Sequence, residues 1–473
     1  MTVTTPPGKS PPGLSGAELG ASGRPPHATA SPALTLLAAL LGFALITLDA
    51  SIVNVALPAI GDALGGGMTG LQWVVDAYTL AFAALMLSTG AFSDRAGATR
   101  AYGIGVALFT AASVACALAP SLGLLTGARV VQGIGAAVVL PASLSLVRQA
   151  YADTAARARA VALWAAGGSV ALALGPVAGG ALTTAWDWRG IFLVNVPLGA
   201  AALALLVRAP RVQRRPAPLD LPGQLTAAVA LIALTLAVIE GGTTGLVSGA
   251  VALAAGALFL YVESRQPHPV VPLGLFRDRT VAVVVASGAA CSVAFYGVVF
   301  VFSLFFQQVQ GRSALEAGLM FLPMTGLIAV TNVASGKLAG RYGPRVPMIA
   351  GQALASLGFL LVVPVDADTP ALHLAFLLVP LALGCALTIP PLTAAMMEAV
   401  PAERAGVAAG VLNAARQVSG GLGIAVFGAL LAEEFVPGLR TSMLISAGLL
   451  AVTAVATLWL RSGPRPAPRE KTA

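Results

Sequence analysis

The sequence predicts an all-α membrane protein with fourteen transmembrane helices, arranged as two six-helix bundles with an extra pair of helices between them. Of its 473 residues, 57% are hydrophobic and only 10% are charged, whereas about 25% of the residues in an average soluble domain are charged. Apolar runs of roughly 20 residues recur along the chain, and each is long enough to cross about 30 Å of hydrocarbon as a helix. We therefore expect a multi-pass integral protein of the cell membrane.

Hydropathy and charge together predict the number of spans and their orientation. Long runs such as the fifth, ninth, twelfth and thirteenth could contain breaks, so hydropathy alone also allows thirteen or fifteen spans. With both termini in the cytoplasm, 22 of the 27 Lys and Arg residues lie inside and 3 outside, as the positive-inside rule requires. The fourteen runs lie near residues 34–58, 70–92, 101–119, 122–147, 159–184, 190–207, 222–240, 245–263, 280–306, 314–335, 346–364, 370–397, 406–431 and 440–460.

Two longer basic interruptions, RAPRVQRRPAPLDLPG and ESRQPHPVVPLGLFRDR, divide the spans into six, two and six. A weak repeat agrees with this division, because GAFSDRAGATR and GKLAGRYGPRV each follow the second span of a six-helix set. Two related bundles around a central path form an architecture suited to alternating access. The predicted units are a disordered cytoplasmic tail (1–32), a first bundle (33–208), linkers with two extra helices (209–279), a second bundle (280–460) and a cytoplasmic tail (461–473).

Several function classes are disfavoured by what the spans and loops contain. No hydrophilic segment is long enough to fold as a domain, the three histidines are scattered, and no Walker A sequence occurs. An enzyme, a metal site and ATP as the energy source are therefore not expected. Because the charge distribution accounts for the net charge of +8, no nucleic-acid partner is expected either. Cys116, Cys291 and Cys385 are interpreted as small packing residues.

Three ionisable residues are predicted to share one layer of the membrane. Asp49, in LDASIVNVALP, lies about 15 residues, or roughly 22 Å, into the first helix. Asp76, in LQWVVDAYTL, and Arg129, in GARVVQGIGAA, reach a similar depth from the outer side. A carboxylate inside a membrane costs about 2.5 to 3.5 kcal/mol unless it faces a cavity, pairs or takes a proton. The layer is therefore a candidate proton-coupling site, with a static Asp49–Arg129 ion pair as the structural alternative.

Two glycine-containing motifs are candidate moving parts. GAFSDRAGATR lies in a short cytoplasmic loop, where a charge cluster could hold the two bundles shut; a solvated turn is the alternative. The fifth helix contains GGSVALALGPVAGGAL, in which small residues allow close helix approach while the proline bends the helix. The residues of these motifs are Gly90, Asp94, Arg95, Gly97 and Arg100 in the loop, and Gly175, Pro176, Gly179 and Gly180 in the helix.

Polar and aromatic residues in other spans are candidates for the lining of a central substrate cavity. Arg416 is the strongest of them because it is charged and lies in the middle of a helix. For each of the others, packing inside a bundle is the alternative. The candidates are Gln132, Asn195, Tyr296, Gln307, Asn413 and Arg416.

Taken together, these stretches resemble the major facilitator superfamily, and within it the fourteen-helix drug:H⁺ antiporters. The resemblance extends from about Leu34 to Leu460 and includes LDASIVNVALP, LLTGARVVQGIGAA, ALGPVAGG, WRGIFLVNVPLG and LNAARQVSGGLG in order. The loop motif departs from the family pattern at Phe92, Ala98 and Thr99. WVVDAYTL is similar to actinobacterial antibiotic exporters of the methylenomycin and puromycin resistance types.

The resemblance implies proton-driven export of a small hydrophobic antibiotic or drug, which would confer resistance. The expected partners are that compound, protons and membrane lipid; the protein is expected to be a monomer powered by the proton-motive force without a cofactor. Arg129 would take part in proton transfer. Two alternatives stay open: the same mechanism with an amino acid, sugar or siderophore as cargo, and a membrane sensor that kept the fold but lost transport.

Overall fold

The structure is a computed structural model that describes residues 31–151, 153–207, 220–266, 269, 271–400 and 405–460. At several helix positions, Asp94 among them, it describes the backbone alone. The tail expected at 1–32 lies outside the described residues as far as residue 30. The tail expected at 461–473 and much of the first linker, from 208 to 219, also lie outside them.

The described ranges confirm an all-α protein. Most helices are long, and two short non-α turns flank α10, a 3₁₀ turn before it and a π turn after it. The helices are α1 (Pro32–Leu64), α2 (Gly67–Ala96), α3 (Ala98–Ala117), α4 (Leu122–Ala150), α5 (Thr154–Ala185), α6 (Gly190–Leu193), α7 (Asn195–Leu206), α8 (Leu221–Glu240), α9 (Gly242–Arg265), η1 (Leu273–Arg277), α10 (Arg279–Leu304), η2 (Phe305–Val309), α11 (Ala314–Met320), α12 (Leu322–Gly326), α13 (Ile328–Tyr342), α14 (Arg345–Val362), α15 (Ala371–Glu398), α16 (Ala405–Glu433) and α17 (Phe435–Thr457).

Within the part of the chain that the structure describes, twelve helical stretches are long and apolar enough to cross a membrane. Helix α2 is 30 residues long but falls outside this set, and its sequence includes the charged residues Asp76 and Arg95. The α6–α7 segment, Gly190–Leu206, is apolar but shorter. The twelve spans are confirmed by length and composition; the full count of fourteen remains a prediction.

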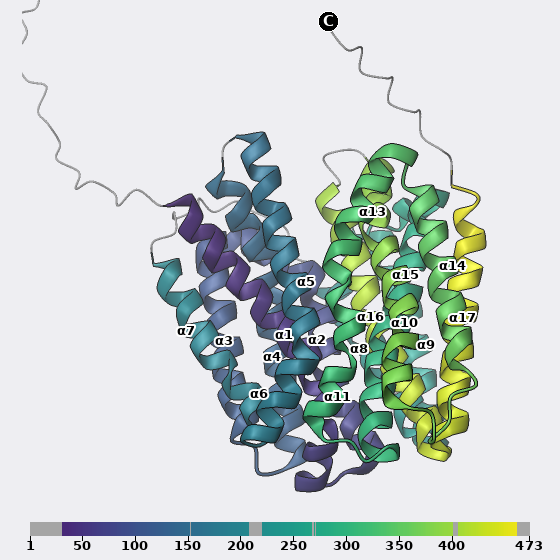
Figure 1. Ribbon diagram of the computed structural model, residues 1–473. Coiled ribbons are helices and arrows are strands. Elements are labelled where there is room, and N and C mark those ends of the chain that lie inside the picture. The colour runs from purple at the N-terminus through teal and green to yellow at the C-terminus, as the bar shows by residue number, and fades with distance from the viewer. Residues whose placement is uncertain are drawn as a thin grey trace, which may run out of the picture.

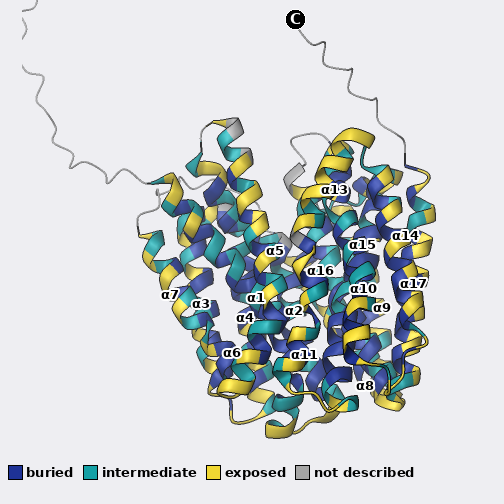
Figure 2. Cartoon of the chain, in the orientation of Figure 1, coloured by how far each residue is buried: buried dark blue, intermediate teal, exposed yellow. Residues whose placement is uncertain are grey.

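The helices form two halves, which we call the N-half (α1–α7) and the C-half (α10–α17), with the α8–α9 hairpin packed against both (Figure 1). Helix α8 contacts α2 of the N-half and α16 of the C-half. Figure 2 shows buried residues toward the inside of each half and exposed residues on the outside. Many of the exposed residues are large and apolar, such as Leu246 and Leu253 on α9 and Val452 on α17. Apolar residues on both the inside and the outside of the helix bundles are expected when the surrounding solvent is lipid, because lipid tails are as apolar as the protein interior.

The helix breaks differ from the expectation. The fifth, twelfth and thirteenth runs are continuous helices, α5, α15 and α16, and the ninth ends in the π turn η2. The tenth run is instead divided into α11, α12 and α13, and the sixth into α6 and α7. Pro323 explains the break between α11 and α12, because a proline inside a helix lacks the backbone N–H and clashes with the carbonyl four residues earlier.

The two halves meet along a surface that we call the seam, formed by α1 with α10, α2 with α16, and α5 with α11. Three amide or hydroxyl donors cross it: Gln72 Nε2 to Ala425 O at 2.7 Å, Ser303 Oγ to Asn54 O at 2.8 Å, and Gln307 Nε2 to Val55 O at 2.9 Å. The ribbons of the halves diverge toward the end where α1 begins and α17 ends (Figure 1). At the opposite end, α5 packs against α11.

Close packing of α14 on α15 depends on glycine. A Cβ placed on Gly384 would collide with the backbone nitrogen of Ala355 and the carbonyl oxygen of Gly351. A Cβ on Gly351 would lie 2.6 Å from the carbonyl oxygen of Gly384. In a membrane, where lipid is as apolar as a side chain, such close backbone contacts are a main source of helix association.

We predict that Gly384→Ala destabilises the protein while Gly448→Ala does not. The first substitution forces α14 and α15 apart, and overpacking of this kind costs about 1 to 3 kcal/mol. The second adds a methyl group where no atom lies within 4 Å. Thermal unfolding of the two purified variants in one detergent measures the difference. Equal unfolding temperatures would contradict this account of the α14–α15 contact.

Candidate functional site

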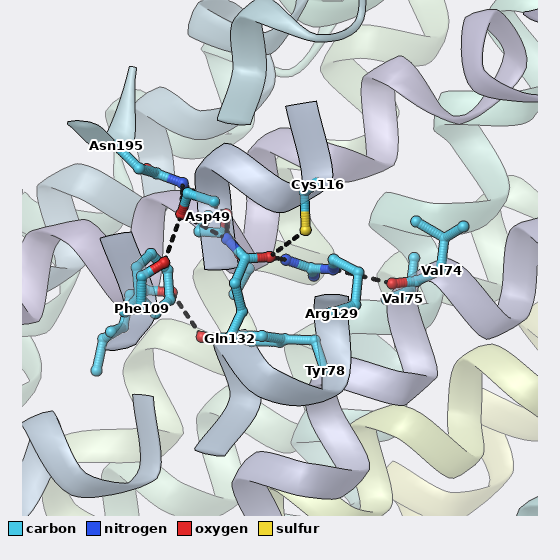
Figure 3. Close-up of polar contacts among 12 residues, drawn as sticks. Asp49, Val74, Val75, Tyr78, Phe109, Cys116, Arg129, Gln132 and Asn195 are labelled. Atoms are coloured by element: carbon cyan, nitrogen blue, oxygen red, sulfur yellow. Dashed lines mark hydrogen bonds and ion pairs between the residues drawn. The ribbon is translucent and has the colours of Figure 1, made fainter. Parts of the chain in front are cut away.

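Asp49 lies at the centre of a buried polar network in the N-half (Figure 3). It is the seventeenth residue after the start of α1, or about 26 Å along the helix, and its side chain is fully buried. Its Oδ2 atom forms an ion pair with Arg129 Nη1. Its Oδ1 atom accepts hydrogen bonds from Gln132 Nε2 at 3.1 Å and from Asn195 Nδ2 at 2.8 Å. Both carboxylate oxygens are therefore satisfied.

Arg129, on α4, has partners at two of its three side-chain nitrogens, and its Nη2 is buried without an acceptor among the described residues. Its Nε donates to the backbone oxygen of Val74 at 3.0 Å, and its Nη1 also donates to Gln132 Oε1 at 2.9 Å. The guanidinium lies 4.4 Å from the centre of the Tyr78 ring, a favourable cation–π distance. Helix α4 can approach α2 this closely because Gly133 has no side chain; a Cβ there would lie 2.5 Å from the Tyr78 carbonyl oxygen.

Ser113 and Cys116 also belong to the network, and the sequence analysis missed both. Gln132 Nε2 donates to Ser113 Oγ at 2.8 Å, and Cys116 Sγ donates to Gln132 Oε1 at 3.2 Å. Cys116 packs in the hydrophobic core, as expected, and in addition donates to this network. The available signal was their spacing of three residues on α3, which places them on one face of that helix.

Asp76 stands apart from this network. It is fully buried on α2, and neither carboxylate oxygen has a hydrogen-bond partner in the described structure. Its Oδ1 atom faces α16 of the C-half, because a Cβ on Gly421 would lie 3.4 Å from it. The predicted layer thus contains one ion pair and one separate acid at the seam. Asp49 and Asp76 therefore do not form a contacting pair of carboxylates, although both belong to the predicted layer.

A small cavity lies at the seam beside these groups. Tyr78 and Thr79 line it from the N-half, and Tyr296, Gln417 and Gly420 line it from the C-half. Tyr78 therefore has the Arg129 guanidinium near its ring and also lines the cavity.

The six predicted cavity residues have different positions. Tyr296 lines the cavity. Gln132 and Asn195 are fully buried in the Asp49 network, and Gln307 donates across the seam to Val55. Asn413 and Arg416 are partly exposed on α16.

The glycine motif of α5 packs on both halves. A Cβ on Gly175 would collide with Ser51 Oγ, and one on Gly179 would lie 2.6 Å from Ile52 O, so this face lies on α1. Gly180 approaches the Ala314 carbonyl of α11 in the same way. Pro176 is contacted from the other side, because a Cβ on Gly318 would collide with the Pro176 carbonyl oxygen. The motif therefore joins α1, α5 and α11 at the end of the seam where the halves are in contact.

The predicted gate motif connects α2 with α3. Gly97 has a φ of 87°, which favours glycine, and ends α2. Arg95 and Arg100 are exposed, and Gly90 is partly buried on α2. The Asp94 side chain lies outside the described residues, so the latch role stays a prediction.

The arrangement is suited to binding and charge movement. Among the described residues, no group of three or more His, Cys, Asp or Glu side chains could hold a metal ion. The site instead contains a buried ion pair, a separate buried acid and a small cavity, all close to the contact between the two halves.

Comparison with known proteins identifies relatives. Residues 39–424 match the family model of the Major Facilitator Superfamily. The chain is 42% identical over 410 residues to the multidrug resistance protein Stp of Mycobacterium tuberculosis, covering 84% of this chain and 76% of that protein. It is 36% identical over 419 residues to the methylenomycin A resistance protein of Bacillus subtilis, covering 87% and 90%.

Solved structures agree on the fold. A D-xylose–proton symporter is similar with a TM-score of 0.68 at 16% identity, covering 92% of this chain and 98% of that one. A bacterial homologue of the lysosomal transporter Spinster, in an inward-facing conformation, is similar with a TM-score of 0.63 at 18% identity, covering 91% and 96%. The chain is thus a multi-pass transporter of the cell membrane, not an enzyme, and it belongs to the Major Facilitator Superfamily.

Proposed function

We propose that the protein is a proton-driven antiporter that exports a small hydrophobic drug or antibiotic from the cell. The names of its relatives, a multidrug resistance protein and a methylenomycin A resistance protein, support the class of cargo. The observation that carries the coupling mechanism is Asp76, a buried carboxyl group without a donor at the contact between the two halves. Inward movement of one proton down 100 mV releases about 2.3 kcal/mol, enough for a drug gradient of about 50-fold.

We infer fourteen spans with both termini in the cytoplasm. Helix α2 crosses because its 30 residues extend about 45 Å, and α6 with α7 crosses as one interrupted span. Adding these two to the twelve apolar spans gives fourteen. In this orientation the halves diverge on the cytoplasmic side and are in contact, through α5 and α11, on the outer side.

Asp76 is proposed to carry the transported proton. An isolated carboxylate away from water costs several kcal/mol, whereas its protonated form costs far less. When Asp76 is protonated, α2 and α16 can pack closely at Gly421, as they do in this structure. Loss of the proton would leave a charge at the seam without a donor, so the halves would be favoured to separate there and hydrate it.

Asp49 and Arg129 are proposed to transmit the change within the N-half. Arg129 contacts α2 through Val74 and Tyr78, so movement of α2 alters the position of the guanidinium. Because Tyr78 also lines the cavity, a bound drug and the Asp76 proton act on the same segment of α2. The bound drug can then favour one orientation of the halves and the Asp76 proton the other, as antiport requires.

The topology predicts on which side introduced cysteines react. With Cys116, Cys291 and Cys385 replaced by alanine, Asp62→Cys and Asp187→Cys should react with an impermeant maleimide in intact cells. Arg95→Cys and Leu221→Cys should react only after permeabilisation. All four native side chains are exposed. Reaction of Asp62→Cys and Arg95→Cys from the same side would mean that α2 does not cross.

We predict that Asp49→Asn abolishes resistance. The substitution leaves Arg129 as an uncompensated buried charge, and breaking a buried pair typically costs about 3 to 5 kcal/mol. Drug susceptibility of an efflux-deficient host should increase at least tenfold relative to wild type at equal protein abundance. The matched control is Asp62→Asn, an exposed acid on the same helix, which should protect as wild type does. Equal protection by Asp49→Asn would contradict the assigned role.

We predict that Asp76→Asn separates drug binding from proton transport. The carboxylate accepts no hydrogen bond, so the neutral amide should leave folding and drug affinity within about twofold. It cannot release a proton, so drug-induced proton release from proteoliposomes should disappear. The measurement uses a pH-sensitive dye and a panel of antibiotics, with an amino acid, a sugar and a siderophore as alternative cargoes. Proton release by the variant at the wild-type rate would contradict the proposal.

A further inference from the structure

Arg416 is a cation inside the C-half for which the described protein supplies no counterion. It lies eleven residues after the start of α16, or about 17 Å along that helix. The ion pairs among the described residues do not include it. Its Nε is buried without an acceptor, and the side chain as a whole is partly exposed.

Among the residues that the structure describes, no carboxylate forms an ion pair with Arg416. Its aliphatic stem packs against α10, where a Cβ on Gly288 would lie 3.2 Å from its Cγ. The ionisable groups on which its charge acts are the thiols of Cys291 and Cys385 and the hydroxyl of Tyr296. Arg129 in the N-half differs because it has a counterion: Asp49 pairs with its Nη1, Gln132 and a backbone carbonyl accept from its Nη1 and Nε, and only its Nη2 lacks an acceptor among the described residues.

Arg416 is close to two residues that line the cavity at the seam. Its neighbour in sequence, Gln417, lines that cavity. Tyr296, on which the charge of Arg416 acts, lines it as well. The Tyr296 ring contacts Phe295 edge to face at a centroid distance of 5.8 Å. The cavity in this conformation has room for about one water molecule. A planar apolar molecule would therefore reach this aromatic surface and the guanidinium only when the halves separate at the seam.

We propose that Arg416 binds an acidic group of the exported compound, so that the substrates are small apolar molecules carrying a carboxylate or another anion. The guanidinium can donate to such a group in the forked geometry that carboxylates favour. This inference rests on the proposed export function and specifies the charge of the cargo. Exchange of an inward proton for an outward anion would also make the membrane voltage act on both steps.

The test compares two probes with a shared scaffold, the anion 1-anilinonaphthalene-8-sulfonate and the neutral N-phenyl-1-naphthylamine. Equilibrium dialysis measures their binding to the full protein in nanodiscs, with empty nanodiscs subtracted for partition into lipid. The variants are Arg416→Gln and Arg416→Lys. Arg440→Gln is the matched control, because it removes an exposed positive charge from the same half.

Wild type should bind the anion saturably. Arg416→Gln should weaken anion binding at least tenfold, as expected for a charged hydrogen bond, and leave the neutral probe within twofold. Arg416→Lys should retain part of the anion affinity, because the charge stays but the forked geometry is lost, and Arg440→Gln should match wild type. An equal loss of both probes in Arg416→Gln would mean that Arg416 is structural and would overturn the proposal. An unchanged anion affinity in Arg416→Gln would also overturn it, and so would the absence of saturable anion binding by wild type.

These outcomes are separate from those that test export. If Asp49→Asn and Asp76→Asn behave as predicted while Arg416→Gln binds both probes normally, the protein is a proton-coupled exporter of uncharged or cationic compounds. If drug-induced proton release is absent in wild type but anion binding depends on Arg416, the coupling mechanism fails and the anion site stands.

Discussion

The ion pair between Asp49 and Arg129 is the interaction on which the N-half depends. Two opposite charges are fully buried in the same half, where either alone would be costly. Three helices satisfy them together: α1 supplies the acid, α4 supplies the base and Gln132, and α2 supplies the Val74 carbonyl. Asn195 on α7 adds a fourth. Because the pair contacts all of these helices, a shift of α2 would move Arg129 and the residues bonded to it.

Two further charged residues inside the spans, Asp76 and Arg416, have no such counterion among the described residues. Asp76 has no donor and Arg416 has no acceptor among the described residues. One belongs to the N-half and faces the seam, and the other belongs to the C-half and lies beside the seam cavity. Charged groups without a partner in the protein are available to mobile ligands. In this account the ligand of the Asp76 carboxyl group is a proton, and the ligand of the Arg416 guanidinium is an anion.

Hydropathy predicted most helices, because a run of about 20 apolar residues has few alternatives to a membrane helix. It could not predict how each helix is rotated, since lipid and protein interior are equally apolar. Asp49 and Arg129 were placed at one depth, and the structure has them in contact. Asp76 was placed at the same depth, yet it faces α16, because rotation of α2 directs it toward the other half. Gln132 and Asn195 looked like cavity residues but complete the Asp49 network.

The central claim is that export is driven by protons, and it is tested most directly by removing the driving force. Proteoliposomes loaded with a drug that the protein exports would be energised with a pH gradient and a membrane voltage, and each would then be collapsed with a selective ionophore. The account predicts that uphill drug transport stops when both are collapsed. Undiminished uphill transport in the absence of both gradients would contradict it.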